Sequence, residues 1–369
     1  MEINIVNLIP KGWLIKAFEN NVEITYVSNR GNYNRKSFIF PKEIIVNEEL
    51  IEGIGLFLGD SDLNKKDKRH LTYASIDKDI SKKALNFLQK SFLTDLKDIT
   101  FLVQYKTLNK NLKEEWSKFL EISKEKIYTR YSDRHRNECL QIQVNGTVFR
   151  KVFELFIKEI LSRDLIKIPE LRRGLLRGLF AAEGNVGIDY LEKKPYISQI
   201  TFNLSIKEQE LCDLISKILE SEIISYKINK HYKTNSQEIV IQNWKNYLKL
   251  WNMDLFNLCK RKNNKFKDIS SKLNVHLSFN DDFRKEFFES LNMNQKDIAK
   301  IIGSWQANVC KTINGTHLLK IEQLNNLLPY SKFTKEDIIK NIEYIRIGLL
   351  TKLKVNEEIL RFLKEFKSF

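Results

Sequence analysis

Two stretches of the sequence carry the same pattern: Gly53-Ile54-Gly55-Leu56-Phe57-Leu58-Gly59-Asp60-Ser61 and Leu176-Arg177-Gly178-Leu179-Phe180-Ala181-Ala182-Glu183-Gly184. In both, a glycine is followed by three mostly apolar residues, a tiny residue, an acid, and then Ser or Gly. The two acids lie 123 positions apart. A pattern that recurs in this way indicates internal duplication of a structural unit.

Both stretches close a predicted helix. Asn47 is a good N-cap, and Glu48 and Glu49 would place carboxylates in the first turn, where they suit the helix dipole. The second helix is expected to begin at Pro169, because proline is favoured at the first helical position. Each acid of the repeated pattern therefore lies at the end of a helix.

Tiny residues recur four positions apart on both helices: Gly55 and Gly59 on the first, Gly178 and Ala182 on the second. Positions four apart share one helix face, and a face without side chains lets two backbones approach closely. Helix packing is therefore predicted at Gly55 and Gly178. If the helices cross there, Asp60 and Glu183 emerge side by side.

Asp60 and Glu183 are the candidate catalytic residues. Two adjacent carboxylates repel each other unless a cation lies between them. Mg²⁺, or Mn²⁺ in its place, suits such a site, because Mg²⁺ is usually held by one or two carboxylates together with substrate phosphates. Metal-assisted hydrolysis of a phosphodiester is the reaction that this pair predicts.

The charge balance favours a partner with dense negative charge. The 369 residues include 62 Lys and Arg against 47 Asp and Glu, which leaves a formal net charge of +15. Such an excess is typical of proteins that bind nucleic acid, since Lys and Arg release the counterions condensed on phosphates. A solvated basic surface without a nucleic-acid partner would show the same balance.

The cysteine spacing and the hydropathy indicate a reducing compartment and a protein that does not span a membrane. The four cysteines lack CxxC spacing and are expected to be small core residues in a reducing environment: Cys139, Cys212, Cys259 and Cys310. No apolar run approaches the length of a membrane span, and the N-terminus lacks the pattern of a signal peptide. We expect a cytoplasmic, nucleoid-associated protein that does not enter membranes.

The chain is predicted to be an α+β protein with four parts: a β-rich N-terminal segment (1–46), a first repeat (47–165), a second repeat (166–270) and an all-α domain (271–369). Each repeat reads α-β-β-α-β-β-α, with one strand lacking a clear signal in each, and residues 112–127 form a helical insertion in the first. The repeats should bury their motif helices against each other. A fragment ending near Ser270 is therefore expected to fold by itself.

The repeated stretches resemble the two LAGLIDADG motifs of single-chain homing endonucleases, and the resemblance extends from about Asn47 to Met253. It implies a monomer whose two four-stranded antiparallel sheets form a saddle on a long double-stranded DNA site. It also implies intron homing by cleavage of both strands. Divalent metal would bind Asp60 and Glu183, with the backbone carbonyls of Gly59 and Ala182 in the metal shell.

Polar side chains alternate with apolar ones along the predicted strands, as expected of a sheet with one DNA-facing side. The candidate nucleic-acid-binding residues of the repeats are Gln141, Gln143, Gln199, Thr201, Asn203, Lys227, Asn229 and His231, together with Arg134 and Arg136 in the polar run that follows the insertion. A solvated sheet without a partner would alternate in the same way.

One departure from the family concerns basic residues near the acids. Family enzymes often carry a basic residue near each active site, late in the second strand pair, and the nearest positions here are Gln143 and Gln242, with Lys245 at a helix start. This departure keeps a second hypothesis open. The chain would then be a cleavage-deficient DNA-binding regulator or an intron RNA maturase.

The segment from Gln295 to Gly315 has helix-turn-helix spacing and resembles the DNA-binding motif of phage-repressor-type regulators. Ala299 would lie where two helices cross, and Gly303 would supply the turn. On the outer face of the recognition helix, Gln306 and Lys311 are candidates for DNA contact. A helical hairpin that does not touch DNA has the same spacing.

Overall fold

The computed structural model describes residues 1–26, 36–63, 69–107, 111–133, 138–191, 194–347 and 351–367. These residues form a mixed α+β protein with two compact units. The first unit is Met1–Asn185, Thr201–Val240 and Asp254–Asn263, and the second is Val186–Ile200, Ile241–Met253 and Asn264–Phe369. None of the described helices is long and apolar enough to cross a membrane.

The N-terminal segment is β-rich, as predicted. Its strands are β1 (Glu2–Asn4), β2 (Leu14–Ala17), β3 (Asn21–Thr25), β4 (Phe38–Pro41) and β5 (Glu43–Ile45), of which β1 pairs with β5 and β2-β3-β4 form a second sheet. Phe40 on β4 is fully buried and stacks on Phe149, with ring centroids 5.7 Å apart. The segment therefore adds its apolar face to the core of the first repeat.

The predicted first repeat (47–165), called the first repeat below, contains α1 (Glu48–Asp60), β6 (His70–Ser75), α2 (Lys78–Phe92), β7 (Ile99–Tyr105), α3 (Leu112–Leu120), β8 (Ile127–Tyr131), β9 (Cys139–Asn145) and α4 (Thr147–Ser162). Its sheet has the order β6-β9-β7-β8. After α1 the described residues contain only an isolated bridge between Ser61 and Tyr73 in place of a strand. The element order of this repeat thus differs from the predicted α-β-β-α-β-β-α within the described residues.

The predicted helical insertion over residues 112–127 is interrupted: after α3 a separate 3-10 helix, η3 (Lys124–Lys126), precedes β8. Helix α3 ends at Leu120, where Glu121 takes a left-handed conformation (φ 60°), and the chain continues into β8, which runs parallel to β7. The β-favouring run Ile127-Tyr128-Thr129 explains the change, because branched and aromatic side chains pack well in strands. The start of the predicted polar run is consequently an edge strand.

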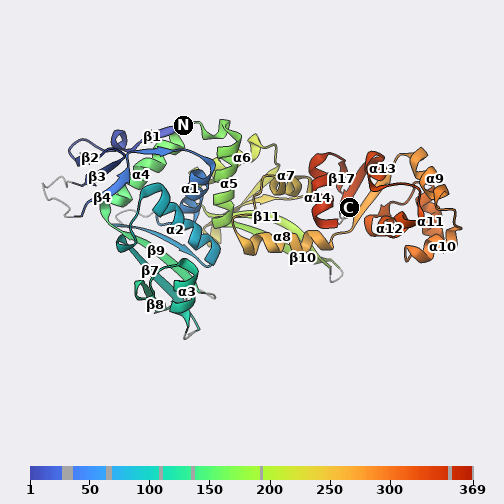
Figure 1. Ribbon diagram of the computed structural model, residues 1–369, viewed down its shortest axis with the longest axis horizontal. Coiled ribbons are helices and arrows are strands. Elements are labelled where there is room, and N and C mark those ends of the chain that lie inside the picture. The colour runs from blue at the N-terminus through green and yellow to red at the C-terminus, as the bar shows by residue number, and fades with distance from the viewer. Residues whose placement is uncertain are drawn as a thin grey trace. The chain divides into compact units, whose positions relative to one another are not determined.

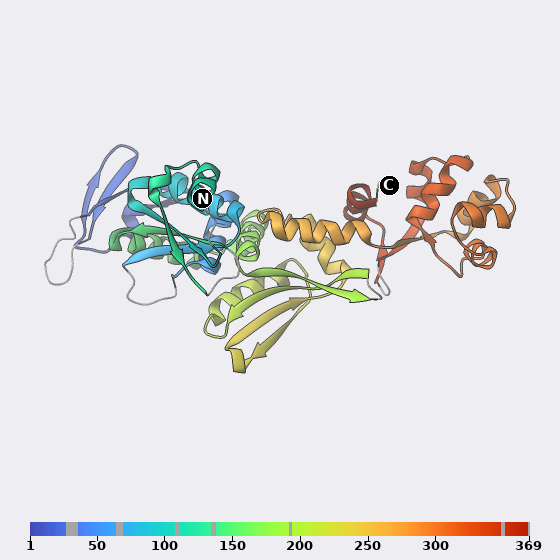
Figure 2. The ribbon, with the colours of Figure 1, turned by 90° about the horizontal axis from the view of Figure 1, so that it is seen from below.

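The predicted second repeat (166–270) contains α5 (Pro169–Glu183), β10 (Gly184–Leu191), β11 (Lys194–Ser205), α6 (Gln209–Ser221), β12 (Tyr226–His231), β13 (Ser236–Ile241) and α7 (Trp244–Asn252). Its sheet has the order β10-β11-β13-β12 and is drawn in yellow-green tones in Figure 2. Strand β10 is the strand without a sequence signal. Its glycines are poor strand formers, but a side chain at Gly187 would lie 3.0 Å from Gln199 Cγ, so close packing requires one of them.

The C-terminal part is α+β, which corrects the prediction of an all-α domain. Its elements are α8 (Lys260–Lys272), β14 (Val275–Phe279), α9 (Asp281–Ser290), α10 (Gln295–Ile301), α11 (Gln306–Ile313), β15 (Leu319–Lys320), α12 (Ile321–Leu327), α13 (Lys335–Lys340), β16 (Ile342–Ile347), β17 (Thr351–Lys354) and α14 (Glu357–Lys367). Four strands form a sheet in the order β15-β14-β16-β17. The strands are short, and β14 is far from its partners β15 and β16 in the chain, so it gains stability only after they have folded beside it.

Helix α14 packs against α7 through aromatic side chains. The Phe362 ring lies 5.9 Å from Trp244 and 5.8 Å from Trp251, and Phe366 lies 5.7 Å from Trp251. The Lys367 ammonium donates to the carbonyl of Ser271 at 2.8 Å. A fragment ending near Ser270 would lose these partners. We therefore no longer expect it to be stable by itself.

Removal of the tail after Ser270 is therefore expected to destabilise the fragment, because Trp244 and Trp251 would face water. In the full chain, Phe362→Ala should lower the free energy of unfolding by about 3–5 kcal/mol, the usual cost of truncating a buried phenylalanine. Denaturant unfolding measures the stability of the fragment and of the Phe362→Ala variant. Lys364→Ala, an exposed change on the same helix, is the control. A fragment as stable as the full chain would contradict the expectation.

Candidate active site

The motif helices α1 and α5 lie side by side in Figure 1 and cross through their glycines. A Cβ atom at Gly55 would lie 2.6 Å from the Leu175 carbonyl oxygen and 2.9 Å from Gly178 Cα. A Cβ at Gly178 would lie 2.1 Å from the Glu52 carbonyl oxygen. Since real Cβ atoms do not approach so closely, alanine at either position would force the two backbones apart.

The close approach continues to the ends of both helices. A Cβ at Gly59 would lie 2.4 Å from Ala182 Cβ and 3.1 Å from Glu183 Cγ. Asp60 and Glu183 follow as the last residues of α1 and α5. The crossing thus brings the two sequence-predicted acids together at one end of the helix pair.

Burial gives both carboxyls an unusually high affinity for protons. Burial raises the pKa of Asp60 to about 7, helped by the negative charge of Asp77 and opposed by the positive charge of Lys262. Burial and then the charge of Asp60 raise the pKa of Glu183 to about 8. A divalent cation at this position would relieve both effects, because it compensates the two negative charges.

Tyr73 adds an unsatisfied polar group beside Asp60. Its side chain is fully buried, and its hydroxyl has no hydrogen-bond partner among the described residues. Burial and the charge of Asp60 raise its pKa well above the usual value. A buried hydroxyl without a partner costs free energy, which a water or a ligand oxygen at the site would recover.

Lys262 brings a positive charge to the acids. It lies in the first turn of α8, is 3 % exposed, and its ammonium donates to the carbonyls of Phe180 at 2.8 Å, Ala181 at 2.7 Å and Ala182 at 3.3 Å. These carbonyls belong to the last turn of α5, where a cation complements the helix dipole. Burial lowers the pKa of Lys262, and the charge of Asp60 opposes that effect.

The residues beside Lys262 anchor the start of α8 to the first repeat. Arg261 donates to both carboxylate oxygens of Asp77, at 2.8 and 2.9 Å, and the Lys260 backbone N–H donates to Asp79 at 2.6 Å. Although burial opposes it, hydrogen bonding to Arg261 lowers the pKa of Asp77. Lys262 therefore has little freedom to leave the ends of the motif helices.

Lys262 was not predicted from the sequence as a site residue. In the run Lys260-Arg261-Lys262 it looks like one of several solvated basic residues. The available signal is its spacing, because Lys262 falls on the buried stripe that includes Cys259, Phe266 and Ile269. A lysine on the apolar stripe of a helix must find partners for its ammonium.

A second buried ionic cluster fixes the chain just after Asp60. Arg150 of α4 is 3 % exposed and donates to the Asp62 carboxylate at 3.1 Å and the Asp62 carbonyl at 3.0 Å. It also donates to the carbonyls of Leu63 at 3.2 Å and His70 at 2.8 Å. The residue that follows the motif is thereby held to the core of the first repeat.

The donor set fits a hard divalent cation. Within the described chain, no three or more His, Cys, Asp or Glu side chains gather as ligands. The two carboxylates would therefore be joined by backbone, water or substrate oxygens, as is usual for Mg²⁺. The Ala182 carbonyl, which was predicted as a metal ligand, already accepts a hydrogen bond from the Lys262 ammonium at 3.3 Å.

The predicted DNA-facing residues differ in exposure. Gln141 and Gln143 lie partly exposed on one face of β9, and Gln143 donates to Asn145 at 2.6 Å. On β11, Gln199 is partly exposed and Asn203 is exposed, whereas Thr201 is 2 % exposed. The hydroxyl of Thr201 is therefore not available to DNA in this conformation, because core packing outweighs the strand alternation.

The remaining predicted contacts lie on an edge strand, on α11 and outside the described residues. Lys227, Asn229 and His231 are exposed on β12, together with the intervening Ile228, so this strand shows no alternation of burial. Gln306 and Lys311 are exposed on α11, after a turn in which Gly303 has φ +60°. Arg134 and Arg136 lie outside the described residues.

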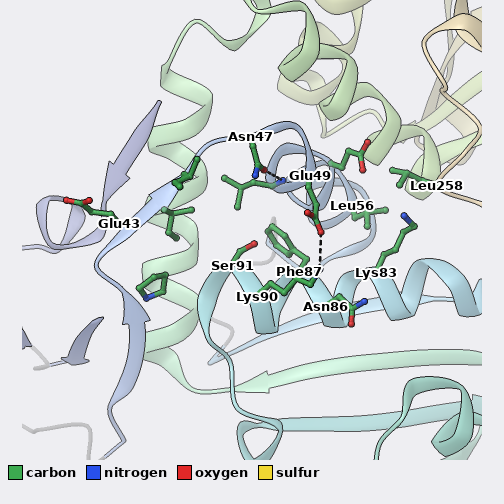
Figure 3. Close-up of a pocket in the computed structure, with 16 residues that line it drawn as sticks. Glu43, Asn47, Glu49, Leu56, Lys83, Asn86, Phe87, Lys90, Ser91 and Leu258 are labelled. Atoms are coloured by element: carbon green, nitrogen blue, oxygen red, sulfur yellow. Dashed lines mark hydrogen bonds and ion pairs between the residues drawn. The ribbon is translucent and has the colours of Figure 1, made fainter. Parts of the chain in front are cut away.

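A hollow of about 410 Å³ lies on another side of α1, between α1, α2 and the N-terminal strands. Figure 3 shows Glu49 and Lys90 at this hollow, where their charged groups lie 3.4 Å apart. Neither Asp60 nor Glu183 lines it. The hollow is therefore separate from the candidate active site.

The raised pKa values predict how pH affects the metal-free chain. The pKa of Asp60 rises from 3.8 to about 7, and that of Glu183 rises from 4.5 to about 8, so protonation of these carboxyls stabilises the folded state. Their contribution is complete below the unfolded-state values and is lost as the pH rises through the folded-state values. Denaturant unfolding in EDTA should show stability falling between about pH 4 and 8 because of this pair.

The Asp60→Asn/Glu183→Gln double variant is the control for this pH dependence, and the fall should be smaller in it. Magnesium added to the wild-type chain at pH 8 should restore stability, because a bound cation favours the folded state. Equal pH profiles for the wild type and the double variant would contradict the assignment of the two pKa values.

Comparison with known proteins finds similarity among solved structures. No protein-family model matches the sequence, and no curated protein matches it. The structure of I-DmoI in complex with DNA and Mn is 12 % identical, with a TM-score of 0.33, and the match covers 57 % of this chain and 98 % of that one. The LAGLIDADG homing endonuclease I-LtrWI bound to target DNA is 12 % identical, with a TM-score of 0.35 and coverage of 73 % and 99 %.

The LAGLIDADG meganuclease I-AabMI bound to uncleaved DNA is 10 % identical, with a TM-score of 0.26 and coverage of 61 % and 93 %. With scores this low, support for a function comes from the side chains of the site itself. In its motif pair and in its structural neighbours, the chain resembles the LAGLIDADG homing endonucleases.

Proposed function

We propose that this protein is a site-specific endonuclease that cuts both strands of DNA with a divalent metal. The observation that carries the proposal is the meeting of Asp60 and Glu183 at the ends of two crossing helices, with pKa values of about 7 and about 8. Carboxyls poised in this way exchange a proton for a metal ion near neutral pH. Mg²⁺ is the proposed ion, with Mn²⁺ as a substitute.

The metal, when bound, would polarise a phosphate oxygen and lower the pKa of a water. Asp60 and Glu183 would hold it at the crossing. Lys262 would keep the last turn of α5 in place, because its ammonium donates hydrogen bonds to three carbonyls of that turn. Its positive charge would offset negative charge on the substrate. The fully buried Tyr73 would limit the entry of bulk water beside Asp60.

The proposed substrate is a long double-stranded site. A net charge of +15 supplies attraction to the phosphate backbone, and the exposed polar residues of β9, β11 and β12 would contact the grooves. A monomer suffices in this proposal, since one chain provides both motif helices. A role in intron homing and a nucleoid-associated location in the cytoplasm belong to the same proposal.

Lys262 bears on the second hypothesis, a cleavage-deficient regulator or RNA maturase. That hypothesis rested on glutamines at the positions expected to be basic. A buried lysine from α8 supplies positive charge near the acids by another route. Cleavage therefore has the better support, and binding without cleavage becomes one outcome of the test.

The test selects cut molecules from a randomised duplex library in Mg²⁺ and repeats the selection in Ca²⁺. The expected result is enrichment of one long sequence among molecules cut on both strands in Mg²⁺. Bound but uncut molecules in Mg²⁺ and in Mn²⁺ would support the regulator, and preferential binding of RNA would support the maturase. Either result would refute the proposed endonuclease.

A further inference from the structure

The sheet of the C-terminal part carries a row of basic residues across all four of its strands. The strand register places Lys320 of β15 opposite His276 of β14, His276 opposite Arg346 of β16, and Arg346 opposite Lys352 of β17. The next position on the same face adds Lys354, opposite Tyr344. We call Lys320, His276, Arg346, Lys352 and Lys354 the basic row.

Strand alternation separates this row from the core. Residues adjacent to the row, such as Leu277, Ile345 and Leu353, are buried and point to the opposite face. Within the row, Lys352 and Lys354 are exposed, and the other members are partly exposed. The row is therefore a polar sheet face within reach of solvent.

The charges of the row are not neutralised by neighbouring acids. None of the ion pairs between described residues involves Lys320, Arg346, Lys352 or Lys354. Glu322, whose charge reaches His276, lies 3.7 Å from the Lys367 ammonium. Like charges on directly opposed strand positions destabilise a sheet, so this arrangement costs stability unless an anion binds there.

Two polar atoms of the row are also unsatisfied. The Nδ1 atom of His276 and the Nε atom of Arg346 are buried and have no hydrogen-bond partner among the described residues. Burial, followed by the charges of Arg346 and Lys320, lowers the pKa of His276 to about 4, so the imidazole is neutral at pH 7. A neutral imidazole between two cations adds no charge to the repulsion within the row.

We propose that the basic row is a docking surface for the phosphate backbone of duplex DNA, separate from the predicted recognition helix α11. Strands lie about 4.8 Å apart, so a row across four strands spans roughly 14 Å. Duplex DNA carries one charge per about 1.7 Å of its axis, so several phosphates fall within that span. Arg346 offers planar donors for a phosphate, and Lys320 and Lys352 offer point charges.

The choice of duplex DNA as the partner rests on the proposed function. The test of the basic row does not depend on cleavage. Binding of the full chain to a random-sequence duplex is measured in EDTA over a range of salt concentrations. The Arg346→Gln/Lys352→Gln variant is compared with Lys285→Gln/Lys340→Gln, which removes the same charge from exposed positions on α9 and α13.

The expected result is a log–log salt slope shallower by up to about 1.8 in the row variant, since each phosphate contact contributes about 0.9. The control should keep the wild-type slope. Thermal unfolding without DNA should show the row variant as stable as the wild type or more so, because one like-charge pair is removed. A less stable row variant with wild-type binding would mean that the row is structural.

Other outcomes also decide against the surface. Equal slopes for the row variant and the control would overturn it, as would loss of slope only in Lys311→Gln on α11. If the row variant lost affinity for RNA but kept its affinity for duplex DNA, the partner would be wrong. If the wild-type chain cut a selected duplex while the row variant bound it normally, the endonuclease would stand without this surface.

Discussion

Replacing Asp60 with asparagine is expected to abolish double-strand cutting while affinity for DNA stays within about tenfold, roughly 1.4 kcal/mol. The amide keeps the shape of the side chain but cannot balance the charge of a divalent cation. Glu183→Gln should have the same effect, because the two carboxyls meet at one crossing. Cleavage of a selected duplex and binding in Ca²⁺ measure the two quantities separately.

The same substitution should make the metal-free chain more stable at pH 8. Ionised Asp60 is unfavourable in its buried position, as its pKa of about 7 indicates, and asparagine is neutral at every pH. Asp213→Asn, an exposed change on α6, is the control and should alter neither cutting nor stability. Cutting at the wild-type rate by either motif variant would remove Asp60 and Glu183 from the active site.

Lys262→Met is expected to reduce the cutting rate at least a hundredfold and to destabilise the fold. Methionine has a similar length but cannot donate, so the carbonyls of Ala181 and Ala182 lose the ammonium as a donor, and the Phe180 carbonyl keeps only the bond from the Gly184 backbone N–H. Each buried acceptor left without a partner costs about 1–3 kcal/mol, so the expected loss is about 2 kcal/mol or more. Denaturant unfolding and single-turnover cleavage measure the two effects.

Lys260→Met is a matched control, because the Lys260 side chain is exposed two positions away and only its backbone N–H contacts Asp79. The Lys262→Met/Asp60→Asn double variant tests the electrostatic link between the two groups. Part of the stability lost in Lys262→Met should return in it, since no charge then remains at Asp60 to be compensated. Wild-type cutting by Lys262→Met would show that the lysine only caps α5.

The sequence by itself determined the motif helices and their ends. Asn47 accepts a hydrogen bond from the Leu50 backbone N–H at 2.9 Å, and Pro169 begins α5, as their residue types predict. Strands such as β9 follow from alternation of polar and apolar residues. These features could be predicted because caps and periodicity depend on neighbours within a few positions.

The tertiary structure decided the features that depend on distant residues. The C-terminal sheet exists because β14 pairs with β16, a strand far along the chain, and neither strand is stable alone. Thr201 occupies a polar position of the pattern but is buried in the core. Lys262 belongs to the site because α8 binds Asp77 and Asp79 and reaches the end of α5. Long-range contacts of this kind leave almost no trace in local periodicity, since they join segments whose order in the chain does not determine which of them will meet.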